Sequence, residues 1–192
     1  LLWLTLAALL SACGSTRMDA PVNDNWQMRR NVLSAINTWE FTGRIGVRDA
    51  NDSQNSSIRW RQINEDYTIN LWGTLNAGAT EITGTTGYVV LEQDGKTPLT
   101  ANSAEELVYQ QLGYELPVTQ LRYWVKGIPA PTSQGQTSFN EENHLIALTQ
   151  DGWSIQYLAY TNYDTESLPT RIRIEKAPLR LDFIRLNWNL QP

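Results

Sequence analysis

The sequence predicts a mainly β protein: an open, strongly curved antiparallel barrel of about ten or eleven strands, closed on one side by a helical lid. Hydrophobic and polar residues alternate along most of the chain after residue 41, which is typical of strands that bury one face. Only three short segments have helical spacing, too few for a doubly wound fold. We expect the helices within residues 103–126 to form the lid on the concave side of the sheet.

The first residues have the pattern of a bacterial lipoprotein signal. The apolar run 1–9 is far shorter than the roughly 20 residues that span a bilayer, so we interpret residues 1–12 as the remnant of a signal peptide. Leu10-Ser11-Ala12-Cys13 then resembles a lipobox, in which the cysteine carries a diacylglyceryl group. Gly14 after Cys13 favours the outer membrane of a Gram-negative bacterium, on its periplasmic face. A free core cysteine behind an ordinary signal remains the alternative.

Composition narrows the class of protein. The formal net charge is −5, which argues against a nucleic-acid partner. One cysteine and one histidine leave no disulfide, thiolate metal site or histidine cluster, and we expect no cofactor. Residues 13–25 are predicted to be the lipidated cysteine and a flexible tether, and residues 26–192 a single domain that acts as a monomer.

The predicted elements follow in order. Asn23 or Asp24 can cap a first helix, whose apolar stripe is predicted to contain Met28, Val32, Ala35 or Ile36, and Trp39. Strands are predicted around 41–48, 58–61, 67–71, 79–83, 88–92, 97–100, 145–150, 153–160, 171–175 and 179–190, with turns at 51–53, 64–66, 84–87 and 94–95. The apolar parity of the last strand changes near Phe183-Ile184, which predicts a β-bulge there.

The two lid helices have clear boundary signals. Ser103 and Glu106 have capping-box spacing, and Gly113 stops the first helix, whose predicted apolar face is Ala104, Leu107, Val108 and Leu112. Pro117 and Gly127 bracket the second helix, with Val118, Leu121 and Val125 on its apolar stripe. Residues 128–135 are predicted to be a loop.

An unusual connection lies between residues 71 and 79. Alternation stops at Leu71 and resumes near Ala79, so this segment joins two strands, yet it carries Leu75 with Trp72 at its base. Leu75 either folds back onto the core or points outward, and an exposed apolar tip indicates a membrane or partner contact.

Six different short motifs follow one another along the chain. They are 41–47 (Phe-Thr-Gly-Arg-Ile-Gly-Val), 73–79 (Gly-Thr-Leu-Asn-Ala-Gly-Ala), 112–118 (Leu-Gly-Tyr-Glu-Leu-Pro-Val), 124–129 (Trp-Val-Lys-Gly-Ile-Pro), 152–157 (Gly-Trp-Ser-Ile-Gln-Tyr) and 168–172 (Leu-Pro-Thr-Arg-Ile). In this order, behind a lipobox, they resemble the LolB family of outer-membrane receptors over nearly the whole mature sequence. The resemblance implies a LolA/LolB-like fold, a periplasmic carrier LolA as partner, and client lipoproteins whose acyl chains occupy an apolar cavity.

The resemblance also implies that a protruding loop delivers the client into the bilayer, here Trp72, Gly73, Thr74, Leu75 and Asn76. The family commonly has Gly-Pro-Leu-Gly at this place. Thr74 lacks the fixed φ of proline, whereas Asn76 can still adopt a positive φ.

The inward parity of the predicted strands and helices supplies residues for the wall of such a cavity. These are Ile45, Val47, Ile58, Trp60, Ile69, Leu71, Ile82, Val90, Leu121, Trp153, Ile155, Tyr157 and Ile172. The alternative is that most of them close a solid core. Arg44, Arg48, Arg59 and Arg61 have outward parity, which indicates either a solvated face or a contact with an acidic rim on the carrier or with lipid headgroups.

The sequence contains none of the common catalytic motifs, so we expect no enzyme. Two other hypotheses remain. One is a tethered structural or regulatory lipoprotein that binds a protein partner without lipid transfer. The other is a lipid-modifying hydrolase, which would need a nucleophile near His144.

Overall fold

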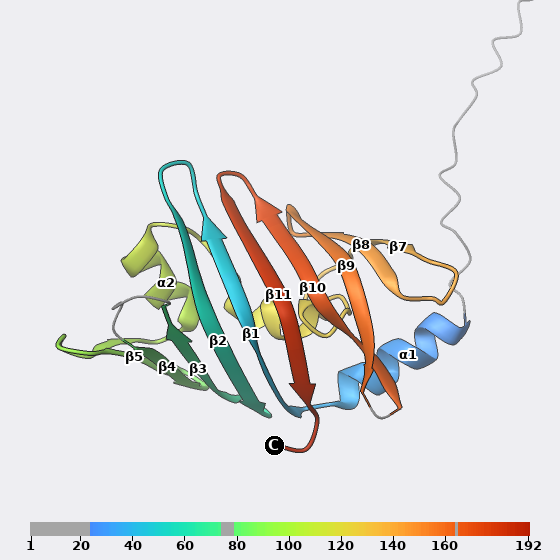
Figure 1. Ribbon diagram of the computed structural model, residues 1–192, viewed down its shortest axis with the longest axis horizontal. Coiled ribbons are helices and arrows are strands. Elements are labelled where there is room, and N and C mark those ends of the chain that lie inside the picture. The colour runs from blue at the N-terminus through green and yellow to red at the C-terminus, as the bar shows by residue number, and fades with distance from the viewer. Residues whose placement is uncertain (1–23, 74–78, 164) are drawn as a thin grey trace, which may run out of the picture.

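The computed structural model describes residues 24–73, 79–163 and 165–192 as a single curved sheet with three helices (Figure 1). In chain order the elements are α1 (Asp24–Ala35), β1 (Thr38–Arg48), β2 (Ser53–Ile63), β3 (Asp66–Trp72), β4 (Thr80–Thr85), β5 (Tyr88–Gln93), β6 (Leu99–Ala101), α2 (Ala104–Leu112), α3 (Val118–Trp124), β7 (Gln136–Phe139), β8 (Leu145–Gln150), β9 (Trp153–Tyr163), β10 (Glu166–Lys176) and β11 (Leu179–Asn189).

The sheet consists of two antiparallel meanders joined at their outer ends by the helices. The strand order is β6-β5-β4-β3-β2-β1-β11-β10-β9-β8-β7, so β1 and β11 meet in the middle while β6 and β7 form the edges. Helices α2 and α3 lie behind the sheet in Figure 1, on its concave side, and α1 lies beside β9 at one end. The predicted fold class, an open antiparallel sheet with a helical lid, is confirmed.

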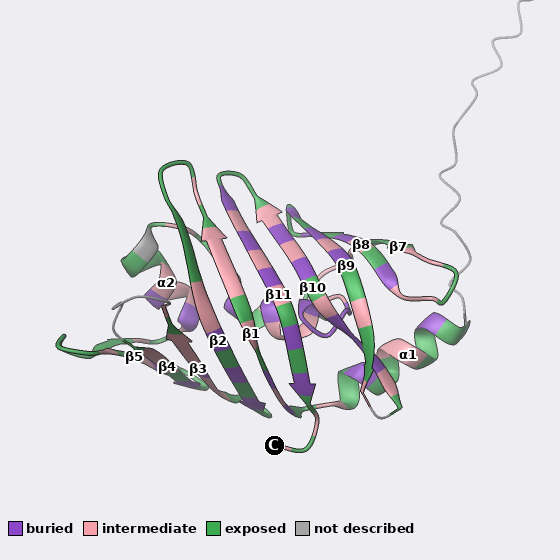
Figure 2. Cartoon of the chain, in the orientation of Figure 1, coloured by how far each residue is buried: buried purple, intermediate pink, exposed green. Residues whose placement is uncertain are grey.

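Alternation of side chains explains why one face of the sheet is buried. Phe41 of β1 is paired with Trp60 of β2, which is paired with Ile69 of β3 and then Ile82 of β4, so these four side chains form a row across the inner face. The intervening positions, such as Arg59, are exposed on the outer face. The stripes of buried and exposed residues along the strands in Figure 2 show this period of two.

The predicted bulge in the last strand is present, two residues further along. The pairing of β1 with β11 shifts between Thr42 and Arg44, and Arg185 has a φ of +56°. The buried positions accordingly switch from Phe183 to Leu186. A Cβ on Gly43 would lie 2.8 Å from Leu186 Cδ2, so the bulged strand requires glycine opposite it.

The lid helices begin and end close to the predicted residues. The Ser103 hydroxyl accepts a hydrogen bond from the Glu106 backbone N–H at 3.1 Å, and Gly113 ends α2 with a φ of +72°. Helix α3 follows Pro117 and buries Val118, Leu121 and Trp124.

The predicted stripe of the first helix was wrong. Met28 and Val32 are exposed, and α1 instead buries Trp26 and Leu33. Trp39 belongs to β1, where it is buried. The reason is tertiary: the Trp26 ring packs on Phe139 of β7 with centroids 4.8 Å apart, which rotates the other face of α1 outward.

Two further predictions needed correction. Gly84 lies within β4 rather than in the following turn, which Gly87 makes with a φ of +78°. Strand β7 was missed because its sequence, Gln-Thr-Ser-Phe, is almost wholly polar, as a half-exposed edge strand permits.

Candidate functional site

A cavity of about 200 Å³ lies between the inner face of β2–β5 and the lid helices α2 and α3. Its apolar wall consists of Trp60, Tyr67, Val89, Ala104 and Val118. The polar residues that line it are Gln62, Glu65, Thr85, Thr86, Asn102, Ser103, Glu105, Thr119 and Arg122. The cavity therefore offers an apolar surface with charged groups on the helices and on the β2–β3 turn.

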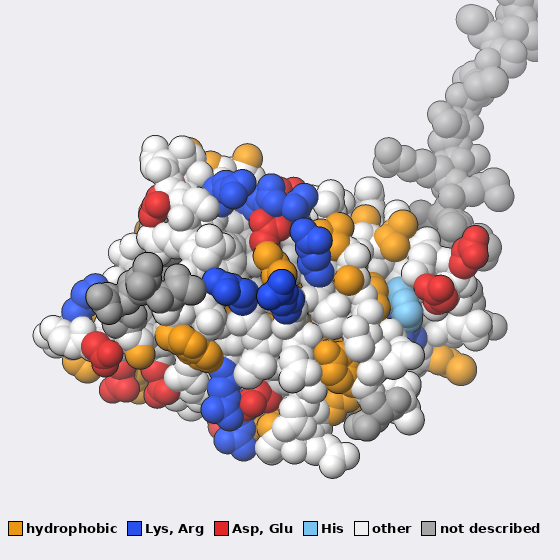
Figure 3. Space-filling view, viewed as in Figure 1, with side chains coloured by type: hydrophobic (Ala, Val, Ile, Leu, Met, Phe, Trp, Pro, Cys, Tyr) orange, Lys and Arg blue, Asp and Glu red, His pale blue; other side chains and the backbone are white. Residues whose placement is uncertain are grey.

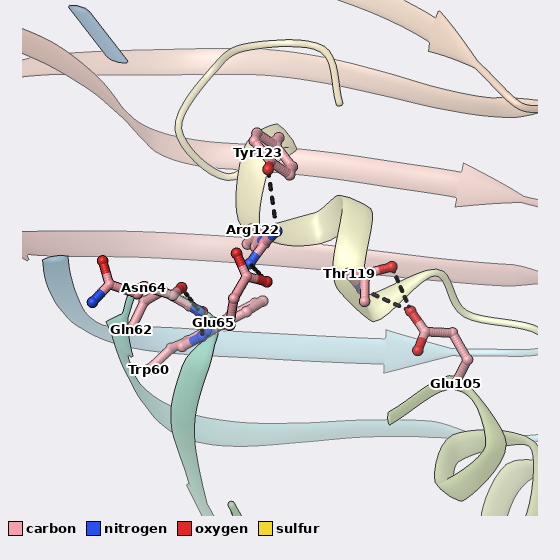
Figure 4. Close-up of polar contacts among 8 residues, drawn as sticks. All are labelled: Trp60, Gln62, Asn64, Glu65, Glu105, Thr119, Arg122 and Tyr123. Atoms are coloured by element: carbon pink, nitrogen blue, oxygen red, sulfur yellow. Dashed lines mark hydrogen bonds and ion pairs between the residues drawn. The ribbon is translucent and has the colours of Figure 1, made fainter. Parts of the chain in front are cut away.

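Polar contacts tie the lid to the sheet and its two helices to each other (Figure 4). Arg122 Nη1 of α3 donates to Glu65 Oε2 of the β2–β3 turn at 2.6 Å, and Arg122 Nη2 donates to the Tyr123 hydroxyl at 3.2 Å. The Thr119 backbone N–H and hydroxyl both donate to Glu105 Oε1 at 2.8 Å, which joins α3 to α2. Because the Glu65 carboxylate is 64% exposed, water screens its ion pair with Arg122.

The polar groups at the base of the cavity are held within β2 and its turn. Trp60 Nε1 donates to Gln62 Oε1 at 3.1 Å, and Gln62 Nε2 donates to the Asn64 carbonyl at 2.7 Å. These bonds satisfy the buried amide of Gln62 and fix the Trp60 ring.

Tyr67 is the main aromatic residue on the sheet side of the cavity. A Cβ on Gly84 would lie 2.1 Å from Tyr67 Cζ, so the phenol ring occupies space that only glycine leaves open. Burial, and after it the charge of Glu105, raise the pKa of Tyr67 to about 12. The hydroxyl is therefore protonated at neutral pH.

Side chains fill the interior beneath the segment that follows α3. Residues 124–130 end α3 and turn inward, and Trp124, Val125, Ile128 and Ala130 are fully buried against β8–β11. Gln150 holds this segment: its Oε1 accepts from Trp124 Nε1 at 2.7 Å and from the Ala130 N–H at 3.0 Å, while its Nε2 donates to the Ala130 carbonyl at 2.8 Å. We call this the packed half and the region around the cavity the hollow half.

The predicted cavity residues fall into groups according to what they line or pack against. Trp60 lines the cavity. Seven are buried in the main hydrophobic core: Ile58, Ile69, Leu121, Trp153, Ile155, Tyr157 and Ile172. Four are partly buried against that core: Ile45, Val47, Leu71 and Ile82. The solid-core alternative thus describes most of the set.

Val90 was assigned to the wrong face of its strand. In β5 it is Val89 that is buried and lines the cavity, while Val90 is paired with the exposed Thr83 on the other face. Sequence reasoning also missed Tyr67, Ala104 and Val118 as cavity residues, although Tyr67 begins a predicted strand and the other two were predicted on apolar helix faces. That parity was the available signal.

The four predicted arginines lie on the outer face of the sheet. Arg44, Arg48, Arg59 and Arg61 are all exposed, and Lys and Arg side chains gather over the middle of this face in Figure 3. Arg59 pairs with Glu40 of the neighbouring strand at 2.9 Å.

Two predicted sites fall on parts of the chain outside the described residues. These are Cys13 and the loop residues Thr74, Leu75 and Asn76. At the base of that loop, Gly73 follows β3 and Trp72 is 41% exposed.

The chain as a whole matches a known family. Residues 37–188 match the family model described as "Outer membrane lipoprotein LolB". The chain belongs to the LolB family. It is 36% identical over 188 residues to the outer-membrane lipoprotein LolB of Stutzerimonas stutzeri (strain A1501), with 95% of this chain and 91% of the relative covered. It is also 36% identical to LolB of Pseudomonas putida (strain GB-1), covering 96% of this chain and 92% of the relative.

Solved structures share the LolB fold at low sequence identity. A LolA superfamily protein from Nitrosomonas europaea has a TM-score of 0.52 at 10% identity, covering 85% of this chain and 90% of that one. A chain described as an outer membrane lipoprotein-sorting protein domain, from Vibrio parahaemolyticus, has a TM-score of 0.56 at 9% identity, covering 87% and 91%.

LolB membership confirms three expectations from the sequence: an outer-membrane lipoprotein, a receptor, and a protein that is not an enzyme. His144 therefore needs no catalytic role. Its ring stacks on Tyr160 with centroids 4.5 Å apart, and its backbone N–H donates to Asn140 Oδ1 at 2.9 Å, so it packs the β7–β8 turn. Burial, and then the charge of Arg29, lower the pKa of His144.

Within the described residues, none of the helices has the length and apolar character needed to cross a membrane.

Proposed function

We propose that the protein accepts lipoproteins from the periplasmic carrier LolA by binding their acyl chains beneath α2 and α3, and then inserts them into the outer membrane. The observation that carries this proposal is the partly apolar cavity of about 200 Å³ under the helical lid of a LolB-family chain. We expect one protein molecule to bind one client.

The physical basis of the transfer is the shielding of acyl chains from water. Each exposed methylene costs about 0.8 kcal/mol, so a carrier must cover the chains at every stage. Transfer then requires only that each acceptor holds the chains more favourably than the preceding donor. A wall that contains Trp60 and Tyr67 gives moderate affinity, which suits a receptor that must release its cargo.

The size of the cavity implies that the lid moves. Sites for drug-sized ligands commonly measure about 300–1,000 Å³, more than the 200 Å³ found here. The polar contacts that join α3 to its surroundings in the hollow half are Arg122–Glu65, whose carboxylate is exposed, and Thr119–Glu105, whose carboxylate is partly exposed. The ion pair breaks at low cost, so separating helices α2 and α3 from β2–β5 mainly costs the apolar contacts of Val89, Leu107 and Val118.

The anchor and the loop complete the proposed mechanism. A lipidated Cys13 and the tether 13–25 keep the domain at the membrane, and Leu75 enters the bilayer during delivery. The exposed Trp72 at the loop base supports an apolar contact there. Exposed Arg44, Arg48, Arg59 and Arg61 provide a basic surface for an acidic rim on the carrier.

The decisive experiment mixes the full chain carrying Cys13→Ala with a lipoprotein bound to its carrier, and follows the cargo by pull-down. We expect the lipoprotein to move to this protein. Cargo that stays on the carrier contradicts the proposal and favours a structural lipoprotein that binds a protein partner.

A second experiment addresses the loop. The variant Leu75→Glu should still accept cargo but fail to insert it into liposomes, because a carboxylate at the tip resists entry into the bilayer. Normal insertion by this variant would exclude an outward role for Leu75.

A further inference from the structure

Two hydrogen-bond donors at the cavity have no acceptor within the residues that the structure describes. They are the Tyr67 hydroxyl, on the sheet side, and Arg122 Nε, on the helix side. Both atoms are shielded from solvent. A buried donor without a partner is costly, so each such group in a folded protein calls for an explanation.

The other buried side-chain polar atoms that line the cavity have partners. Gln62 bonds at both ends of its amide, and Glu105 Oε1 accepts two hydrogen bonds from Thr119 (Figure 4). The remaining unpaired side-chain atom among the described residues, Gln120 Oε1, belongs to a residue that does not line this cavity. The two buried side-chain atoms of the cavity that lack a partner can therefore both donate a hydrogen bond.

Both donors are held in place by other contacts. The Tyr67 ring is seated over Gly84, and its raised pKa keeps the proton on the hydroxyl. Arg122 uses Nη1 for Glu65 and Nη2 for the Tyr123 hydroxyl, so Nε is the nitrogen left over. Neither donor has to give up a hydrogen bond in order to bind a ligand, and both become accessible when α2 and α3 move away from the sheet as proposed above.

We propose that Tyr67 and Arg122 donate hydrogen bonds to the carbonyl oxygens of a fatty acyl ester or amide whose hydrocarbon chain lies against Trp60, Val89 and Val118. This inference rests on the proposed function and adds a specificity: the cavity recognises the acyl head as well as the chain. Ester and amide carbonyl oxygens both accept hydrogen bonds, and an ester brings no donor of its own, which matches two unpaired donors.

The charges around the cavity favour an uncharged ester or amide over a free fatty acid. Glu65 and Glu105 both line the cavity, against one cation, Arg122, among the described lining residues. A carboxylate head would meet two like charges at close range, whereas the head of a diacylglyceryl or N-acyl group carries no charge. The expected ligand is therefore the acylated end of a lipoprotein or a related neutral acyl ester.

The test measures displacement of an environment-sensitive dye from the full chain by two small probes with equal numbers of heavy atoms, methyl decanoate and tridecane. We expect Tyr67→Phe and Arg122→Met each to weaken methyl decanoate binding about five- to tenfold, the loss expected for one hydrogen bond. Tridecane binding should not change. Decanoate should bind more weakly than its methyl ester to the unaltered protein.

Matched controls replace the same residue types at positions whose side chains do not line the cavity. Tyr88→Phe removes an exposed hydroxyl, and Arg171→Met removes an exposed guanidinium on the outer face, so neither should alter either probe. Urea unfolding of each variant confirms that it folds.

The outcomes separate this inference from the proposed function. Unchanged methyl decanoate binding in both cavity variants overturns the inference. An equal loss for methyl decanoate and tridecane also overturns it, since the two residues then only shape the cavity, and acyl binding stands. If neither probe displaces the dye from the unaltered protein, acyl binding itself fails, and the inference fails with it.

Discussion

The packed and hollow halves of the interior lie under one continuous lid, yet they are filled differently. Beneath residues 124–130, four side chains of the connecting segment are fully buried against the sheet. Beneath α2, the small side chain of Ala104 faces Trp60 and Tyr67 across a cavity. The difference comes from the chain path: Gly127, with a φ of +79°, turns the segment into the sheet, whereas α2 stays above it. We therefore expect the packed half to contribute more to stability than the hollow half.

The largest expected effect tests this division with one substitution made in both halves. Ile172→Ala removes a fully buried side chain from the packed half and should lower the free energy of unfolding by about 2–5 kcal/mol. Ile82→Ala, at a partly buried position in the hollow half, should cost less than half as much. Urea unfolding measures both, and equal losses would mean that the halves do not differ in packing.

The second prediction concerns a buried amine in the packed half. Lys126 Nζ donates to the carbonyls of Leu33 and Ile36 at 2.9 and 2.8 Å. Burial, and then the charge of Arg122, lower its pKa from 10.5 to about 8. Between these values the unfolded chain binds more protons than the folded protein, so the contribution of Lys126 to stability rises with pH from 8 to 10.5, by on the order of 3 kcal/mol.

The measurement is the difference in unfolding free energy between the unaltered protein and Lys126→Met at pH 7.5 and pH 10. A difference that stays constant contradicts the predicted titration. Arg122, one turn earlier and in the hollow half, behaves differently: burial lowers its pKa, but the hydrogen bond and charge of Glu65, with a smaller effect of Tyr123, outweigh this and raise it.

Substitutions that add side-chain volume should affect stability in the packed half and acyl binding in the hollow half. Ala130→Leu inserts a larger side chain at a fully buried position of the packed half and should destabilise the fold by about 1–3 kcal/mol. Ala104→Leu fills part of the cavity and should leave stability nearly unchanged while it blocks acyl binding. The reverse pattern, with acyl binding retained in Ala104→Leu, would show that ligands bind elsewhere.

The smallest expected effect on stability comes from removing an exposed ion pair in the hollow half. Glu65→Gln removes the ion pair with Arg122 and should change the unfolding free energy by less than about 1 kcal/mol, because the carboxylate is largely in water. Thermal unfolding of the two proteins side by side checks this. A larger loss of unfolding free energy would indicate that the ion pair holds the lid firmly to the sheet.

The sequence predicted the sheet well because strand alternation is a local signal. Phe41, Trp60 and Ile69 lie on the inner face as their parity required. Capping is equally local, and Ser103 and Gly113 bound α2 as expected. The family resemblance then rested on motifs that span these same elements.

The predictions that failed concern positions whose burial depends on residues far away in the sequence. Helix α1 contains two pairs of apolar residues with helical spacing, Met28 with Val32 and Trp26 with Leu33, and Phe139 of β7 decides which pair is buried. Parity also cannot tell which inner-face residues border empty space. The position of the empty space depends on the inward path of residues 124–130, and the side chain of Gln150 on β8 holds this path through hydrogen bonds.

Helix α1 has a mechanical consequence for a domain held by its N-terminal end. Three sets of contacts hold this helix. The Trp26 ring packs on Phe139, Arg29 donates a hydrogen bond to the Ser167 carbonyl, and Lys126 donates hydrogen bonds to two carbonyls at the end of the helix. Tension applied ahead of Asp24 is thus shared among β7, β10 and the end of α3, and does not peel β1 from the centre of the sheet. If the chain is anchored ahead of Asp24, as we propose, motion of the membrane does not load the strands that flank the cavity.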